Sequence, residues 1–484
     1  MGLDPGLRRL ALGTLLAAYP GPVPPGWAVD LVAEGLAGHT LFGTNVHDPA
    51  QVAASTAALR AGRSDVLVAI DEEGGDVTRL AHATGSPYPG NAALGAVDDR
   101  SLTRRVYAAI GAELAALGIT VNLAPTVDVN TADENPVIGT RSFGADPVRV
   151  AAHSAAAVEG LQAVGVAACA KHFPGHGATV ADSHHELPTV DVAPELLRER
   201  DLPPFAAVIA AGARAIMTAH IRVPALTGDG PATFSRAVLV DLLRREYGFT
   251  GTVITDALEM KGAALAAGGV GPAAVRALAA GADLLCIGAK VDAGLVEHVV
   301  AEIVGAITDG RLDRARVEEA AGRTAALAAW VRPAGSPSAT LSDALGYDAA
   351  RLAVRIEGDL IGLERPLVVQ LHAASTIAEG RVPWGLGPHL DGLEEVRIVA
   401  TETDPAALGR LAEGRPIVVV GRHLHRLPGG AALVDALAAA YPVTVVEMGW
   451  PGRWRPTGVR AWVTTFGASH ANGRAAAEAL GLIR

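Results

Sequence analysis

The sequence has few cysteines and no surplus of positive charge, and each shortage excludes a class of protein. Only 2 of its 484 residues are cysteine, Cys169 and Cys286, so a fold held together by disulfides is excluded. Both lie in apolar, strand-like runs, where we expect buried, reduced thiols. The formal net charge of −11 argues against nucleic acid or an anionic membrane as a partner. A neutral or polar small molecule remains open as the ligand.

The sequence also lacks a membrane span, because no run reaches the roughly 18 apolar residues that a spanning helix needs. Its start, LRRLALGTLLAAYPG, places two arginines before an apolar run, as a signal peptide would. However, Asp4 weakens the charged region, no convincing cleavage site follows, and the apolar periodicity continues into WAVDLVAEGLAGHTLFG. We therefore expect this segment to be the first element of the fold, and the protein to be cytoplasmic.

The length of the chain predicts two domains, and half of its residues are apolar, which supplies ample core. Short β-branched runs alternate with Ala- and Leu-rich stretches of helical period, which is typical of a parallel α/β fold. Seven strands are predicted in the first part, at His39–Phe42, Asp65–Ile70, Thr120–Leu123, Val166–Ala170, Ala215–Thr218, Thr252–Thr255 and Asp283–Ile287. Predicted helices include Ser101–Leu117, Val148–Ala163, Ala206–Gly212 and Pro272–Ala280. The pattern does not place an eighth strand.

Polar residues at the ends of these strands favour a closed barrel over an open sheet. Asp71, Lys171 with His172, His220 and Asp256 each follow a different apolar run. In a (β/α)8 barrel of the TIM type, the carboxyl ends of all strands meet at one mouth, so these side chains would come together. In an open sheet they would be spread along an edge.

A second, smaller α/β domain is predicted after the barrel. We expect the barrel at residues 1–331, a Pro-, Gly- and Ser-rich linker at 332–346, and a parallel-sheet sandwich domain at 347–484. Its predicted strands are Leu367–Leu371, Val396–Thr401, Pro416–Gly421, Val443–Met448 and Ala461–Phe466, and its predicted helices are Pro405–Glu413, Ala431–Ala440 and Ala471–Leu480. It contains no phosphate-binding glycine fingerprint, so no cofactor is expected.

The segment KHFPGHGATVADSHHELP, residues 171–188, is the strongest indication of a site. It carries four histidines within fifteen residues, where composition alone predicts roughly half of one. Its glycines and proline predict a loop. An aspartate two residues before a histidine, as in Asp182 and His184, can accept the Nδ1 proton and leave Nε2 free to move a proton. This pair is the best acid/base candidate.

Other candidates are more ambiguous by themselves. Asp256, in GTVITDALEM, suits a nucleophile, a base, a metal ligand or simply the N-cap of the next helix. Asp71, in VLVAIDEEGGDVTRL, has the same alternatives, and Gly74 and Gly75 beside it would allow the backbone of the chain to approach a ligand closely. Arg79 and Arg141 supply planar hydrogen-bonding groups. Carboxylates that accept and cations that donate are what a sugar-binding site requires.

These motifs resemble those of a known family. KHFPGHG followed by DSHHELP is similar to the signature of bacterial β-N-acetylglucosaminidases of glycoside hydrolase family 3. DEEGGDVTRL, LAPTVDVN, IGTRSFGADP, MTAH and ITDALEM match further elements of that family in order, so the resemblance covers about residues 10 to 330.

The resemblance implies a retaining hydrolase that removes terminal β-linked N-acetylglucosamine without cofactor or metal. Asp256 would be the nucleophile, and His184, oriented by Asp182, the acid/base. The residues implied to hold the sugar are Asp71, Arg79, Arg141, Lys171 and His172. Peptidoglycan-derived disaccharides, chitin fragments and aryl glycosides all present the same terminal sugar, and a role in peptidoglycan recycling is one expectation from the resemblance.

The chain departs from the family pattern in two respects. Many relatives have Asp-Asp after the sixth strand, where this chain has Asp256-Ala257. The second domain resembles that of two-domain members only in architecture, so a direct catalytic role for it is doubtful, and we expect packing, specificity or homodimer contacts.

Three kinds of alternative stay open. The first is another activity of the same site, either a phosphorylase that releases the sugar to phosphate or a β-glucosidase. A metal-dependent barrel hydrolase could use Lys171, His220 and Asp256, although the position of the usual His-x-His pair holds the single His47. The third alternative is a sugar-binding protein without catalysis.

Overall fold

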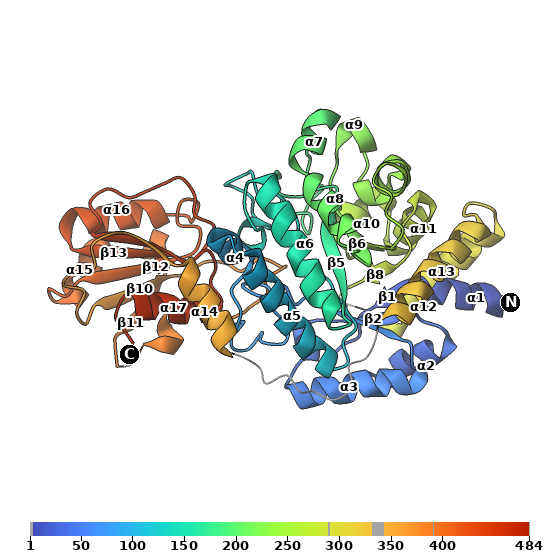
Figure 1. Cartoon of the computed structure of the whole chain (residues 1–484), viewed down its shortest axis with the longest axis horizontal. Coiled ribbons are helices and arrows are strands. Elements are labelled where there is room, and N and C mark those ends of the chain that lie inside the picture. The colour runs from blue at the N-terminus through green and yellow to red at the C-terminus, as the bar shows by residue number, and fades with distance from the viewer. Residues whose placement is uncertain (1–2, 289–290, 332–342, 391, 484) are drawn as a thin grey trace.

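The computed structural model describes residues 3–288, 291–331, 343–390 and 392–483. It contains an eight-stranded parallel sheet that curls into a barrel and a separate six-stranded sheet domain beside it (Figure 1). The fold class predicted from the sequence is confirmed.

The barrel strands follow one another around the sheet in chain order. They are β1 Leu15–Ala17, β2 Gly38–Leu41, β3 Leu67–Ile70, β4 Val121–Asn122, β5 Ala167–Phe173, β6 Ala215–Thr218, β7 Thr252–Thr255 and β8 Leu285–Ile287. A parallel bridge between Ile254 and Leu284 joins β7 to the segment entering β8, which nearly closes the sheet. The seven predicted strands are all present. The missing eighth is β1, inside the segment predicted to be the first structural element.

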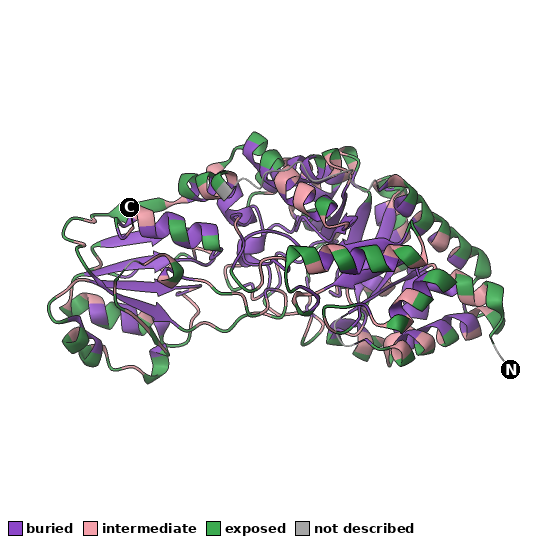
Figure 2. Cartoon of the chain, turned by 90° about the horizontal axis from the view of Figure 1, so that it is seen from below, coloured by how far each residue is buried: buried purple, intermediate pink, exposed green. Residues whose placement is uncertain are grey.

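Alternate residues of the barrel strands face opposite sides, as the pleat requires. Leu67, Ala69 and Cys169 belong to a cluster inside the barrel, whereas Val68, Ile70 and Ala168 pack outward against the helices. Figure 2 shows the result as buried strands surrounded by helices that are exposed only on their outer sides. The interior is therefore filled by side chains, and the mouth of the barrel is where its strand ends can hold a ligand.

The helices around the barrel precede β1, connect successive strands, and follow β8. They are α1 Pro5–Leu12, α2 Gly26–Glu34, α3 Pro49–Gly62, α4 Asn91–Val97, α5 Arg100–Ala116, α6 Pro147–Ala163, α7 Pro194–Arg200, α8 Pro203–Ala210, α9 Pro224–Thr227, η4 Ala237–Glu246, α10 Lys261–Ala267, α11 Val270–Ala280, α12 Ala293–Thr308 and α13 Arg314–Trp330. Several begin at an aspartate whose carboxylate accepts a hydrogen bond from the first turn, such as Asp48 for α3 and Asp99 for α5. Among the described residues no single helix has the length and apolarity to cross a membrane, although α10 and α11 meet that criterion as a pair bent by 92°.

The second domain is a sheet with helices on both faces. Its strands are β9 Arg355–Gly358, β10 Leu367–Leu371, β11 Glu395–Ile398, β12 Ile417–Gly421, β13 Val443–Glu447 and β14 Ala461–Thr464, and its helices are α14 Asp343–Ala353, α15 Pro405–Ala412, α16 Gly430–Ala440 and α17 His470–Ala479. Leu367 and Val369 pack with α15 and α16, while Val368 packs with α17. Five strands are parallel, as predicted; the sixth, β9, is an antiparallel edge that the sequence did not indicate.

The two domains are in direct contact. Helix α14 packs against α4 and α5 of the barrel domain as well as against α17. It begins at Asp343, within the range predicted as linker, and residues 332–342 of that range lie outside the described residues. The guanidinium of Arg355 donates to the carbonyl of Ala96 at 2.9 Å, and the backbone N–H of Ala468 donates to the carboxylate of Asp76 at 2.8 Å.

Candidate active site

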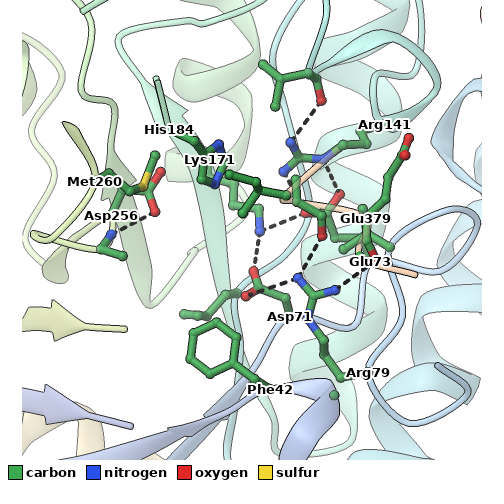
Figure 3. Close-up of a pocket in the computed structure, with 18 of the residues that line it drawn as sticks. Phe42, Asp71, Glu73, Arg79, Arg141, Lys171, His184, Asp256, Met260 and Glu379 are labelled. Carbon is green, nitrogen blue, oxygen red and sulfur yellow. Dashed lines mark hydrogen bonds and ion pairs between the residues drawn. The ribbon is translucent and has the colours of Figure 1, made fainter. Parts of the chain in front are cut away.

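A cavity of about 570 Å³ lies at the carboxyl ends of the barrel strands. Seven of the eight predicted site residues line it: Asp71, Arg79, Arg141, Lys171, His172, His184 and Asp256. The eighth, Asp182, is bonded to His184. In Figure 3, Asp256 and Met260 lie at one side of the cavity, and Asp71, Arg79 and Glu379 lie at the other.

A buried carboxylate, Glu73, organises the cations on one wall. The guanidinium of Arg141 donates two hydrogen bonds to the Glu73 carboxylate, from Nε at 3.0 Å and from Nη2 at 2.8 Å. The ammonium of Lys171 lies 2.7 Å from Glu73 and 2.6 Å from Asp71. Lys171 belongs to β5, which continues three residues past its predicted end. Its side chain is thus held between two carboxylates, and the guanidinium of Arg141 is oriented by a two-point contact.

The charges of this network keep it ionised. Burial alone would raise the pKa of Glu73, but the positive charges of Arg141 and Lys171 lower it well below its usual range. Burial would lower the pKa of Lys171, and the charges of Asp71 and Glu73 raise it instead. The wall therefore presents fixed charges, with Asp71 only partly enclosed and open to the cavity.

His172 and His176 are both fixed by Asp128. The Asp128 carboxylate contacts Nδ1 of His172 at 2.7 Å and accepts a hydrogen bond from the backbone N–H of His176 at 2.7 Å. Although burial would raise the pKa of Asp128, the charges of the two histidines lower it. With Nδ1 engaged, the Nε2 atom of His172 is the one that faces Arg141, at 3.5 Å.

The loop after β5 carries the predicted acid/base pair. Asp182 Oδ1 lies 2.6 Å from Nδ1 of His184 and accepts from the backbone N–H of His184 at 2.9 Å. Burial would raise the pKa of Asp182, yet its hydrogen bond to His184 lowers it to about 2. Asp182 is therefore a carboxylate acceptor that fixes the ring, and the other ring nitrogen, Nε2, is free to exchange a proton.

Close packing holds this loop against the barrel. A Cβ at Gly177 would lie 2.0 Å from the carbonyl oxygen of Val129, so only glycine fits there. His176 is buried and bonds through Nδ1 to Thr179 at 2.7 Å and through Nε2 to Ser183 at 3.2 Å. Ser183, the residue before His184, is thus held by the buried side chain of His176.

Asp256 follows β7 directly and opens to the cavity. Its Oδ1 accepts a hydrogen bond from the backbone N–H of Ala257 at 2.8 Å. Enclosure by protein would raise the pKa of Asp256, but the charges of His220, His172 and His184 lower it. This carboxyl is therefore an anion across the neutral pH range, as a nucleophile must be.

The structure does not support two expectations from the sequence, the close approach of a ligand at Gly74 and Gly75 and a metal-binding role for His220. A Cβ at Gly75 would lie 2.4 Å from the Cα atom of Gly90, so the close approach at Gly74 and Gly75 is made by another segment of the chain rather than by a ligand. His220 bonds to Thr233 through Nδ1 at 2.8 Å and to the carbonyl of Ala257 through Nε2 at 3.1 Å, so both ring nitrogens are engaged. Among the residues that the structure describes, no group of three or more His, Cys, Asp or Glu side chains is arranged to hold a metal.

Sequence reasoning missed three important side chains. Glu73 and Asp128 lie in DEEGGDVTRL and LAPTVDVN, two motifs that carry the family resemblance, but the sequence alone assigns neither residue a role. Their position two or more residues beyond a strand end, among other polar groups, was the available signal. Glu379 of the second domain also lines the cavity, together with its neighbours at 377–382, and nothing in its local sequence indicated this.

Comparison with known proteins identifies the family of the chain. Residues 28–327 match the model of the glycosyl hydrolase family 3 N terminal domain. A beta-hexosaminidase A of Pseudoalteromonas piscicida is 34% identical over 363 residues, which are 70% of this chain and 60% of the relative, so the match spans less than two thirds of that longer protein. A beta-hexosaminidase of Chromobacterium violaceum is 39% identical over 257 residues, 52% of this chain and 71% of the relative.

A solved structure resembles the chain over both domains. The glycoside hydrolase family 3 beta-N-acetylglucosaminidase from Paenibacillus sp. str. FPU-7 is 32% identical, with a TM-score of 0.87, and the match covers 99% of this chain and 97% of that one. The family suggested by the sequence motifs is thus confirmed. The chain belongs to glycosyl hydrolase family 3.

Proposed function

We propose that the protein is a retaining β-N-acetylglucosaminidase that removes a terminal non-reducing sugar. The observation that carries the proposal is that Asp256 and His184 line one cavity, with His184 held at 2.6 Å by Asp182. The names of its relatives, beta-hexosaminidase and beta-N-acetylglucosaminidase, support the sugar preference.

In the first step the Asp256 carboxylate attacks the anomeric carbon and forms a glycosyl-enzyme ester. The glycosidic C–O bond breaks, its electrons pass to the leaving oxygen, and the protonated His184 gives that oxygen the proton on Nε2. The carboxylate of Asp182 stabilises the imidazolium before the transfer.

In the second step the neutral His184 takes a proton from water through Nε2, and the water oxygen attacks the anomeric carbon. The bond to Asp256 breaks and returns the carboxylate. Two inversions give net retention. A neutral imidazole suits this step, because it adds no second anion beside the departing carboxylate of Asp256.

The opposite wall binds the sugar in this proposal. Asp71 accepts hydrogen bonds from hydroxyl groups, Arg79 and Lys171 donate to them, and His172, whose Nδ1 is engaged by Asp128, offers Nε2 as an acceptor. Arg141 fixes Glu73 and with it the position of Lys171. Because these side chains are already paired or hydrogen-bonded, little ordering remains to be done on binding.

The test uses nitrophenyl β-N-acetylglucosaminide and the matching glucoside, each with and without phosphate. We expect faster turnover of the acetamido sugar, release of free sugar whose first-formed anomer is β, and no dependence on phosphate. A sugar phosphate as product would make the enzyme a phosphorylase, and an α-anomer would exclude the Asp256 ester.

Asp256→Asn is expected to lower kcat at least about 1,000-fold, because the amide is a poor nucleophile. Asp241→Asn, on the exposed side of η4, is the matched control and should retain full activity. Substantial turnover by Asp256→Asn would remove Asp256 from the mechanism.

A further inference from the structure

The second domain forms part of the cavity wall. The segment 376–382, between β10 and the turn at 387–389, lines the cavity through Ile377, Ala378, Glu379, Gly380, Arg381 and Val382. Ile377 is 56% exposed although it is large and apolar. The segment lies on the side of Asp71 and Arg79, opposite Asp256 (Figure 3).

Arg79 depends on this segment for its position. Its guanidinium donates from Nη2 to the carbonyl of Ala378 at 2.8 Å and from Nη1 to the carbonyl of Glu379 at 3.3 Å. The nearest carboxylate oxygen of Asp71 is 4.0 Å from Nη2, which is too far for a hydrogen bond. Arg79 is only 9% exposed, and its buried Nε atom has no hydrogen-bond partner among the described residues. Two carbonyl groups of the other domain are therefore its main partners.

The segment is itself fastened by a buried ionic contact between the domains. Glu379 Oε1 accepts from Nη2 of Arg422 at 2.6 Å, and Oε2 accepts from the backbone N–H of Thr376 at 3.1 Å. The same Nη2 of Arg422 lies 3.2 Å from Asp76, which belongs to the barrel. Because Glu379, Arg422 and Asp76 are all buried, this contact fixes the direction of the Ala378 and Glu379 carbonyls.

We propose that the second domain acts in sugar binding by holding Arg79 in place, and that Glu379 is the positioning residue. The inference rests on the proposed function, in which Arg79 contacts the sugar. Arg79 lies away from the bond that breaks, so it binds the ground state and the transition state alike. Loss of its position therefore raises KM and leaves kcat nearly unchanged.

A double-mutant cycle between Glu379 and Arg79 tests this, with nitrophenyl β-N-acetylglucosaminide as substrate. Glu379→Ala and Arg79→Ala are each expected to raise KM about tenfold with kcat within about twofold. The double variant is expected to resemble Arg79→Ala alone, because Glu379 acts only through that side chain. If Glu379→Ala does not fold, Glu379→Gln takes its place, with a rise in KM of about threefold expected.

Trp450→Phe is the control for a merely loosened interface. It removes another hydrogen bond between the domains, from Nε1 of Trp450 to Asp133 at 3.4 Å, and Arg79 is not involved. KM should not change. Additive effects of Glu379→Ala and Arg79→Ala, or an equal rise in KM with Trp450→Phe, would overturn the proposal.

The same cycle measured on the binding of free N-acetylglucosamine by calorimetry separates the two claims. If the wild type is active but the losses of affinity in Glu379→Ala and Arg79→Ala are additive, the positioning role of Glu379 is wrong and the proposed activity is unaffected. If the wild type binds the sugar but does not cleave its glycosides, the proposed activity is wrong. Non-additive losses of affinity would still support the positioning role of Glu379. Absence of sugar binding by the wild type would overturn both.

Discussion

The proton on Nε2 of His184 is needed most when the leaving group is a poor one. We expect His184→Ala to lower kcat/KM for a natural disaccharide by about 100- to 10,000-fold, the usual contribution of general acid catalysis. For the nitrophenyl glycoside the loss should be less than about tenfold, because nitrophenolate is stable without a proton. Since kcat/KM reports only the steps up to formation of the glycosyl-enzyme, the comparison isolates the role of His184 as acid.

His185, the exposed neighbour of His184, provides the control for this experiment. His185→Ala should affect both substrates by less than about twofold. Equal losses for the two substrates in His184→Ala would mean that His184 is not the proton donor.

At the scale of single residues, the sequence predicted the side chains whose role depends on local position. Asp71 and Asp256 follow apolar strand runs, and Asp182 lies two residues from His184, so both signals are visible in a short window. Glu73 could not be assigned, because its role depends on Arg141, which is 68 residues away in the chain. Its position beyond the end of β3 places it near the mouth of the barrel, but the pairing with Arg141 leaves no local pattern.

At the scale of elements, the fold was predictable wherever a strand had a β-branched apolar run. The strands β6 and β7 were predicted with their observed bounds. The three-residue β1, Leu-Leu-Ala, follows helix α1 without a change in apolar composition, so periodicity could not separate the two. All residues of β9 are exposed, so it lacks the burial pattern by which a strand is recognised.

The loop that carries His184 should become less stable in acid through His176. Burial, together with the charge of His172, lowers the pKa of His176 from 6.5 to about 4, although the charge of Asp128 acts in the opposite sense. The unfolded chain takes up this proton below pH 6.5 and the folded chain only near pH 4. The stabilisation is therefore complete above pH 6.5 and is lost as the pH falls toward 4, by about 3 kcal/mol in total.

Chemical denaturation at a series of pH values measures this effect. His176→Gln cannot titrate, so its free energy of unfolding should fall less steeply than that of the wild type between pH 6.5 and 4. A slope unaltered by His176→Gln would show that this histidine is not the group responsible.

At the scale of the whole molecule, the two domains were predictable but their joint cavity was not. The change in composition near residue 332 indicated a boundary, and the alternation of strands and helices indicated both folds. Whether the second domain reached the site depended on how the segment 376–382 lies against the barrel, which is a property of the assembled structure. Packing, specificity or homodimer contacts were expected of this domain without any residue being named, and the structure adds that its segment 376–382 lines the cavity.

The contact at Asp76 is expected to couple the unfolding of the two domains. Its buried carboxylate accepts from Thr140 at 2.6 Å in its own domain, from the backbone N–H of Ala468 at 2.8 Å, and lies 3.2 Å from Arg422. Asp76→Ala leaves the hydroxyl of Thr140 and the backbone N–H of Ala468 without this acceptor, removes one of the two carboxylates beside Arg422, and should cost about 3 kcal/mol. We expect one calorimetric transition in the wild type and two in the variant, with the second domain unfolding first.

Asp133→Ala is the matched control, since it removes two weaker contacts between the domains, a long hydrogen bond from Nε1 of Trp450 at 3.4 Å and an ion pair with Arg453. Arg453, its ionic partner at 3.6 Å, has a side chain that is 97% exposed, so the loss should be less than about 1 kcal/mol. The single transition should remain in that variant. If Asp76→Ala also unfolded in one transition at the wild-type temperature, the domains would have to be coupled by the packing of α14 on α4 rather than by the buried ionic contact.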